Sequence, residues 1–181
     1  MLLIGCRPSG RHTEQHDVFF GIAESPKGLI PYVNAFWPEA KGKLHIDAWR
    51  EVTAVNGYGI EVTDRTVHQK QIQSQQLYFI NLGGYQPGVF DEPHFKMITV
   101  QAGKAAAIQF AKTTPFYRDV QFDKAVSHVD DKFGVDVDDL YEIEDILPHD
   151  QKARFWLKIT PLITSVEDEL HLGYFKLSTL I

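Results

Sequence analysis

The chain has 181 residues, 44% of them apolar, and a formal net charge of −6. This size suits one globular domain or two small ones, and the core can be held without a disulfide or a structural metal. The single cysteine, Cys6, excludes an internal disulfide and a zinc site of several thiolates, and it favours a reducing, cytoplasmic location. The acidic balance, with a pI near 5.7, excludes the basic footprint of nucleic-acid binding.

No segment approaches the roughly 18 consecutive apolar residues of a membrane-spanning helix, so no membrane partner is expected. The apolar segment Met1–Cys6 is too short for the core of a signal peptide, and no basic segment precedes it. Acidic residues gather between Asp119 and Asp150, but they lack the spacing of a calcium-binding loop. We interpret them as a solvated surface.

In the first half of the chain, alternating apolar residues predict strands at Met1–Cys6 and His16–Ala23. Ser25-Pro26 is typical of a helix start, and apolar residues at helical spacing continue to Trp37. Because Pro31 lies inside this segment, the helix either begins near residue 30 or has a distorted first turn.

The dipeptide Asn56-Gly57 is a strong signal for a hairpin, with strands predicted at Glu51–Val55 and Tyr58–Thr63. A polar, glutamine-rich segment follows and is interpreted as a linker. Further strands are predicted at Leu77–Leu82, Phe95–Gln101, Phe133–Asp136 and Leu140–Glu144, and a helix at Ala102–Thr113. Two tail strands, Ala153–Thr160 and Glu169–Leu177, are expected to extend one sheet.

The two halves of the chain resemble each other. Gly5 meets Gly83 at a shift of 78 positions, and the shift becomes 83 after five extra residues near Pro115–Val120, a loop-like stretch. Two polar motifs recur in the same order: Glu14-x-His16 and His45-x-Asp47 in the first half, Glu92-x-His94 and His128-x-Asp130 in the second. We therefore divide the chain into a first repeat at 1–63, a linker at 64–76, a second repeat at 77–146 and a C-terminal strand extension at 147–181.

The two motifs of one repeat are expected to meet. Residues two apart on a strand share a face, so Glu14 and His16 are expected on the face that the following helix covers. His45 and Asp47 lie just before the predicted third strand. If the helix makes a right-handed crossover, the second and third strands run parallel and begin at the same edge of the sheet, which brings the four side chains together.

Two imidazoles and two carboxylates in one place allow three interpretations. They could bind a divalent metal such as zinc, manganese or iron, or form an acid–base pair. They could also be a structural network that joins two loops at the sheet edge. The structural interpretation is favoured, because ligands of parallel sheets usually bind at the opposite ends of the strands. The candidate residues are Glu14, His16, His45, Asp47, Glu92, His94, His128 and Asp130.

Two other features are weaker candidates. Cys6 is near His12 and His16 in the sequence and could form a thiol–imidazole pair, but a single cysteine at a strand end is more often a core residue. Gly83-Gly84-Tyr85 follows a predicted strand, yet its spacing fits no phosphate-binding loop, so a turn is favoured.

At these motifs the sequence resembles domain-of-unknown-function family number 1543, a short module that is often present in two copies. The residues that carry the resemblance are Arg7–Arg11, Glu14–Asp17, Phe36-Trp37, His45–Asp47 and Gly57-Tyr58, with Asn81–Tyr85 and Glu92-x-His94 in the second copy. It covers roughly residues 1–146 and leaves the tail outside. The family implies no established activity, so the resemblance supports the duplication and leaves the function open.

The sequence therefore predicts an α+β fold of two tandem ββαββ repeats related by a pseudo-twofold, with mixed sheets, helices on one side and two C-terminal strands. A pair of ferredoxin-like layers is the alternative architecture. The favoured function is small-ligand or partner binding without catalysis. The alternatives are a metal-dependent enzyme that uses the Glu/His/His/Asp cluster, and a structural homodimer subunit with the tail strands at its interface.

Overall fold

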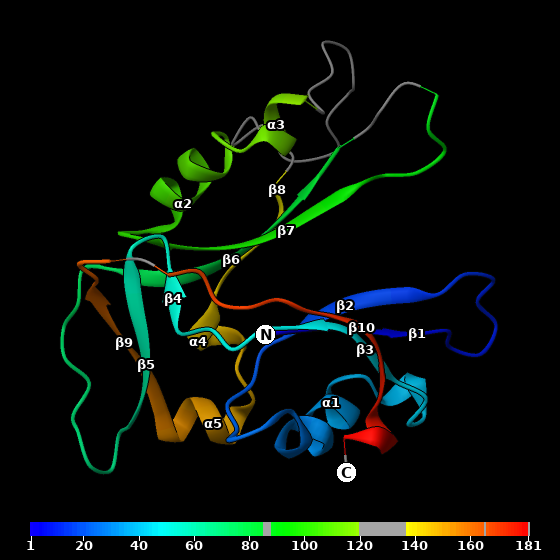
Figure 1. The fold of residues 1–181 in the computed structure, drawn as a ribbon, viewed down its shortest axis with the longest axis horizontal. Coiled ribbons are helices and arrows are strands. Elements are labelled where there is room, and N and C mark those ends of the chain that lie inside the picture. The colour runs from blue at the N-terminus through cyan, green and yellow to red at the C-terminus, as the bar shows by residue number, and fades with distance from the viewer. Residues whose placement is uncertain (85–87, 120–136, 165, 181) are drawn as a thin grey trace. The chain divides into compact units, whose positions relative to one another are not determined.

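The computed structural model describes residues 1–84, 88–119, 137–164 and 166–180 (Figure 1). The chain divides into two compact units: residues 1–70 with 146–181 form the first, and residues 71–145 form the second. The fold is α+β, with several antiparallel sheets and few helices. Every strand pairing in the described part of the chain is antiparallel, so the prediction of mixed sheets is wrong. None of the helices within the described ranges combines the length and apolar character that crossing a membrane requires.

A four-stranded sheet in the order β10-β3-β1-β2 forms the centre of the first unit. Its strands are β1 (Leu2–Cys6), β2 (Gln15–Phe19), β3 (His45–Trp49) and β10 (His171–Lys176). Because β2 and β3 both pair antiparallel with β1, they run in the same direction and begin at the same edge of the sheet. The third strand begins at His45 and not at Glu51, so the His-x-Asp motif lies within a strand.

Helical turns cover one face of this sheet, and α1 lies against it in Figure 1. They are η1 (Pro26–Leu29), α1 (Ile30–Phe36), η2 (Pro38–Ala40) and η3 (Leu177–Thr179). Leu29 and Val33 pack with Leu2, Ile4 and Ile46 in a buried core, because alternate residues of each strand point to the helical side. The start of α1 at Ile30 confirms the predicted start near residue 30, and the 3-10 turn η1 occupies the four residues before it.

A second sheet of the first unit, in the order β4-β5-β9, contains the predicted hairpin. Its strands are β4 (Ala54–Val55), β5 (Tyr58–Asp64) and β9 (Phe155–Pro161), and α5 (His149–Arg154) precedes β9. Asn56 and Gly57 form the two-residue turn with φ values of 36° and 82°. The prediction that both tail strands extend one sheet is wrong, because β9 pairs with β5 whereas β10 pairs with β3.

The second unit has a three-stranded sheet in the order β7-β6-β8. Its elements are β6 (Gln76–Gly83), β7 (His94–Gln101), α2 (Lys104–Ala111), α3 (Pro115–Asp119) and β8 (Val137–Glu142), and α4 (Ile143–Ile146) follows. The alanines of α2 allow close packing: Ala107 and Ala111 are buried against Ile80 and Leu82. The segment that begins at Pro115 is helical rather than a loop. The predicted strand Phe133–Asp136 lies outside the described residues.

Candidate metal centre

Gly5 on β1 lies between the two histidines of the first unit. In the strand register it is opposite His16 of β2 on one side and opposite His45 of β3 on the other. Side chains of directly opposed residues stand on the same face of a sheet. The two imidazoles therefore share one face, and only the hydrogen of a glycine lies between them.

This shared face is the one that α1 does not cover. Ile4 and Cys6 of β1 belong to the core under the helices, and Gly5, between them, points to the other side. On β2 the helix contacts the face of Phe19, which is opposite to that of His16. The expectation that the motif lies on the helix-covered face is therefore wrong.

Asp47 reaches the same face through a β-bulge. Leu3 is opposite Ala48 and Ile4 is opposite Ile46, so Asp47 is the extra residue of β3. A bulge changes where the following side chains point. It allows Asp47 to stand beside His45 on the open face, while Trp49 still packs against the core on the other.

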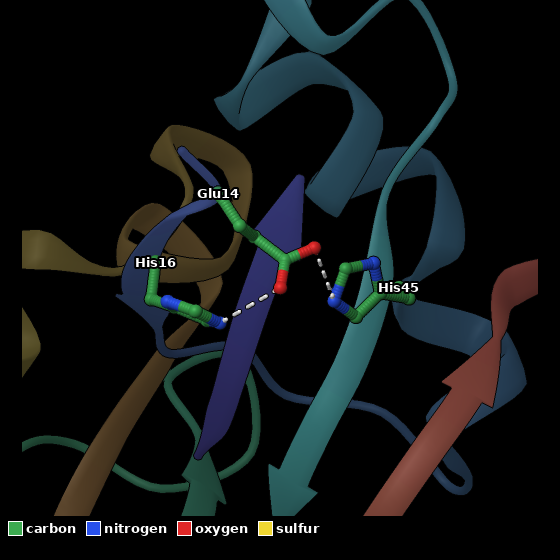
Figure 2. A group of neighbouring side chains, drawn as sticks. All are labelled: Glu14, His16 and His45. Carbon is green, nitrogen blue, oxygen red and sulfur yellow. Dashed lines mark ion pairs between the residues drawn. The ribbon is translucent and has the colours of Figure 1, made fainter. Parts of the chain in front are cut away.

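Close contacts join the four side chains of the cluster. The Nε2 atom of His16 lies 3.6 Å from Glu14 Oε2 and 3.2 Å from Asp47 Oδ2. The Nε2 atom of His45 lies 3.3 Å from Glu14 Oε1 and 3.2 Å from Asp47 Oδ1. Figure 2 shows the Glu14 carboxylate between the two imidazoles, with one oxygen toward each. Ligand atoms about 2.0–2.2 Å from one zinc ion are separated by roughly 3–4 Å, so these spacings fit a shared metal ion.

Two buried atoms of the cluster lack a hydrogen bond. His45 is only 4% exposed, and its Nε2 makes no hydrogen bond to any residue that the structure describes. The buried Oδ2 of Asp47 likewise finds no hydrogen-bond partner within the described residues. A buried polar atom without a partner costs about 1–3 kcal/mol, so these two atoms need an explanation.

The cluster has a buried side and an open side. The side chains of His45 and Asp47 are 5% and 25% exposed, whereas those of His16 and Glu14 are 39% and 46% exposed. An ion bound here would be fixed from below by β3 and reached by solvent past Glu14 and His16. The arrangement therefore leaves room for ligands that do not come from the protein.

Gly5 is required by the space that the cluster occupies. A Cβ atom at this position would lie 2.6 Å from His45 Nε2, 2.7 Å from Asp47 Oδ2 and 3.0 Å from His16 Cδ2. These separations are shorter than ordinary van der Waals contacts, so at least two ligand side chains would have to move. The glycine thus allows the four side chains to converge directly above the backbone of β1.

The second unit contains a related but smaller cluster. One ligand atom from each of Glu92, His94 and Asp138 lies within 4.8 Å of the others, and His94 Nε2 is 3.1 Å from Asp138 Oδ2. Gly83 is opposite His94 in the register, and a Cβ atom there would meet the Asp138 carboxylate. The β6–β8 register shifts between Asn81 and Leu82, which makes Asp138 the extra residue of β8.

Sequence reasoning missed Asp138. The sequence comparison paired Asp47 with Asp130, whereas the bulge in each unit pairs Asp47 with Asp138. The available signal was that Asp138 lies near the start of an alternating segment, but it was interpreted as part of an acidic surface. His128 and Asp130 lie outside the described residues.

The weaker candidates stand apart from the cluster. Cys6 is buried on the core side of β1, and burial together with the charge of Glu14 raises the pKa of its thiol. A raised pKa keeps the thiol protonated, which is opposite to what a nucleophilic cysteine needs. The backbone N–H of Gly84 donates to the carbonyl of Pro93 at 3.2 Å, so it is not free to hold an anion.

Comparisons with known proteins extend this description. The chain is similar to a solved structure described as "Crystal structure of a protein Il1583 from Idiomarina loihiensis", with 20% identity, a TM-score of 0.62, and coverage of 97% of this chain and 94% of that one. This likeness shows the fold alone. Among curated proteins, none matches the chain. Residues 11–62, which carry Glu14, His16, His45 and Asp47, match the family described as Domain of Unknown Function (DUF1543), and the resemblance that the sequence indicated is confirmed over this range.

Proposed function

We propose that the first unit is a small-ligand-binding module whose ligand is one divalent transition-metal ion, held by Glu14, His16, His45 and Asp47. Two imidazole nitrogens with two carboxylates are a donor set that suits zinc, manganese or iron. The carboxylates supply two negative charges, which a divalent ion neutralises. The observation that carries the proposal is the buried Nε2 of His45, which makes no hydrogen bond within the described residues although it lies 3.3 Å from Glu14 Oε1 and 3.2 Å from Asp47 Oδ1.

The competing interpretation is a purely structural network. Such a network pairs its buried polar atoms by hydrogen bonds, because unpaired ones are costly. Here His45 Nε2 and Asp47 Oδ2 have no such bond in the described residues, although each lies near an oppositely charged or polar group. A cation between the donors accounts for both atoms at once. A bound metal therefore explains the cluster better than a structural network does.

A shared arrangement of the two units favours a duplicated module with unequal sites. Each unit has a glycine on its central strand, a Glu-x-His motif at the start of the next strand and an aspartate at a bulge. We infer that the second cluster, with His94 as its one imidazole among the described residues, binds a transition metal more weakly. Fewer nitrogen donors shift preference toward harder ions such as manganese or magnesium.

A metal-dependent enzyme is the second candidate function. The observation that favours it is the exposure of Glu14 and His16, because solvent and small molecules can reach an ion that these side chains hold. A first test compares metal-loaded and metal-free protein in the hydrolysis of 4-nitrophenyl acetate and 4-nitrophenyl phosphate. Metal-dependent turnover that His45→Gln abolishes would support this function.

The decisive experiment for metal binding uses protein purified without a histidine tag and stripped with a chelator. The protein is titrated separately with Zn²⁺, Mn²⁺, Co²⁺ and Fe²⁺, the last under anaerobic conditions. The bound metal is measured by inductively coupled plasma mass spectrometry. We expect one tightly bound equivalent, with at least a hundred-fold loss of affinity in His45→Gln. His68→Ala removes an exposed histidine outside the cluster and is the matched control. Uptake below about a tenth of an equivalent for every metal would exclude the proposed function.

A further inference from the structure

Exposed apolar side chains of β10 border the proposed metal centre. The ring of Tyr174 lies 4.3 Å from the ring of His45, centroid to centroid, with the planes tilted by 31°. Tyr174 is 63% exposed and Leu172 is 73% exposed. We call these two side chains the apolar ledge.

The apolar ledge stands on the same face of the sheet as the metal centre. Leu172 is opposite Ala48, and Ala48 is opposite Leu3, which alternates with the core residues of β1. Tyr174 precedes Phe175, which packs against the core on the other face. A molecule bound on the open side of the metal ion would therefore meet the ledge and not the helices.

The distance between the two features suits a small organic molecule. β10 is separated from β1 by β3 alone, and neighbouring strands lie about 4.8 Å apart, so the backbone of β10 is roughly 10 Å from that of β1. Manganese and iron prefer five or six ligands, which leaves one or two positions beyond the four protein side chains. A ligand with oxygen donors at one end and a body the size of a phenyl ring spans this distance.

We propose that the metal centre takes a small organic oxyanion with an aromatic or branched apolar body, which binds the ion through its oxygens and packs its body on the apolar ledge. This inference rests on the proposed metal binding and adds the chemical class of the molecule that completes the coordination. The four protein donors and a divalent ion together carry no net charge, so an incoming anionic oxygen donor does not meet a site that is already negative.

The test uses Co²⁺-loaded protein and two metal-binding probes that differ only in their bodies: acetohydroxamate and benzohydroxamate. Binding is followed by the visible absorption of the cobalt. We expect benzohydroxamate to bind at least about ten-fold more tightly, because its ring is removed from water by the ledge. The ratio of the two dissociation constants is the readout, since any change in the metal itself affects both probes alike.

Variants of the ledge assign the preference to these side chains. In the double variant Leu172→Ala, Tyr174→Ala, the ratio is expected to fall below about two-fold, and in Tyr174→Phe it is expected to persist. Both residues are exposed, so the variants are not expected to impair folding. A ratio that the double variant leaves unchanged would overturn the inference, as would cobalt binding without any response to either probe. Failure to bind cobalt would instead contradict the proposed metal binding, on which this inference rests.

A second copy of the chain is the other occupant that the ledge could have. Light scattering at high protein concentration distinguishes the two. A wild-type dimer that the double variant converts to a monomer would overturn the small-molecule inference, whereas a monomer in both cases supports it.

Discussion

Replacing Gly5 with alanine adds one methyl group beneath the four side chains of the proposed metal centre. The new carbon would lie 2.6 Å from His45 Nε2 and 2.7 Å from Asp47 Oδ2, so these atoms must retreat by close to 1 Å. Overpacking of this kind costs about 1–3 kcal/mol, and alanine recovers about 0.4–1 kcal/mol by restricting the unfolded chain. We therefore expect the metal-free protein to lose up to about 2.6 kcal/mol of unfolding free energy.

The effect of Gly5→Ala on metal affinity is expected to be larger and more specific. Displacing ligands without removing them typically lowers affinity 10- to 100-fold, which corresponds to about 1.4–2.8 kcal/mol. The assay is urea unfolding in chelator and in saturating Zn²⁺, together with competition against a chromophoric chelator for the dissociation constant. The stabilisation that metal confers on the wild type should shrink in the variant by the same amount.

Gly103→Ala is the matched control for this substitution. Gly103 has an extended backbone, and no heavy atom of the described residues lies within 4 Å of its added Cβ. The Gly103→Ala variant should therefore bind metal with the same affinity as the wild type. Equal affinities in Gly5→Ala and the wild type would refute the claim that the four side chains converge above Gly5.

Three further substitutions test the scaffold of the first unit. Gln151 donates to the carbonyl of Ile22 at 2.8 Å and accepts from its N–H at 2.7 Å, so Gln151→Leu should cost about 2–4 kcal/mol in urea unfolding, because two backbone groups lose their partners. Gly57→Ala, at a φ of 82° with open space around it, should cost about 1 kcal/mol of hairpin stability in the same assay. Hydrogen bonds from Thr66 and Arg154 lower the pKa of Asp64 to about 2 from 3.8. The stability that the ionised Asp64 contributes to the folded state is therefore present above pH 4 and is lost as the pH falls through 2. The difference in unfolding free energy between wild type and Asp64→Asn, measured by urea unfolding, should close over that range.

Each of these expectations has its own contrary outcome. A Gln151→Leu variant as stable as Gln69→Leu, which changes an exposed glutamine, would mean that the Ile22 contact is not formed. An unaffected Gly57→Ala would contradict the left-handed turn. A stability gap for Asp64→Asn that is constant between pH 6 and pH 2 would contradict the lowered pKa.

The convergence of Glu14, His16, His45 and Asp47 could be predicted because it depends only on element order. Strands that flank a central antiparallel strand begin at the same edge, whatever the details of the helix between them. The strands β2 and β3 run parallel, as expected, although β1 lies between them and pairs with both. The predicted edge was right because β2 and β3 have the same direction.

The face of the cluster and the role of Gly5 could not be predicted. Alternation places His16 with Val18, but it does not say which of the two faces the helix will cover. The covered face is set by the packing of Leu2, Ile4 and Ile46 in the core. These residues lie on the strands beside β2, and the sequence of β2 alone does not show their positions. A glycine in a strand signals close approach in general terms, and only the register identifies what approaches Gly5.

The bulge explains why the second half was harder to interpret. A β-bulge inserts one residue without any required sequence signature, so it alters the spacing between motifs in a way that simple shifts cannot follow. The comparison of the halves consequently aligned Asp47 with Asp130 instead of Asp138. The sheets that the two tail strands join could not be predicted either. β9 and β10 have the same alternating pattern, yet they pair with strands of different sheets.

The most direct measurement for the proposed metal centre is an anomalous difference map from a crystal grown with Zn²⁺, recorded at the zinc absorption edge. We predict one strong peak about 2.0–2.2 Å from Nε2 of both His16 and His45, in contact with the carboxylates of Glu14 and Asp47. A cluster closed by direct hydrogen bonds, with no peak among these four side chains, would contradict it.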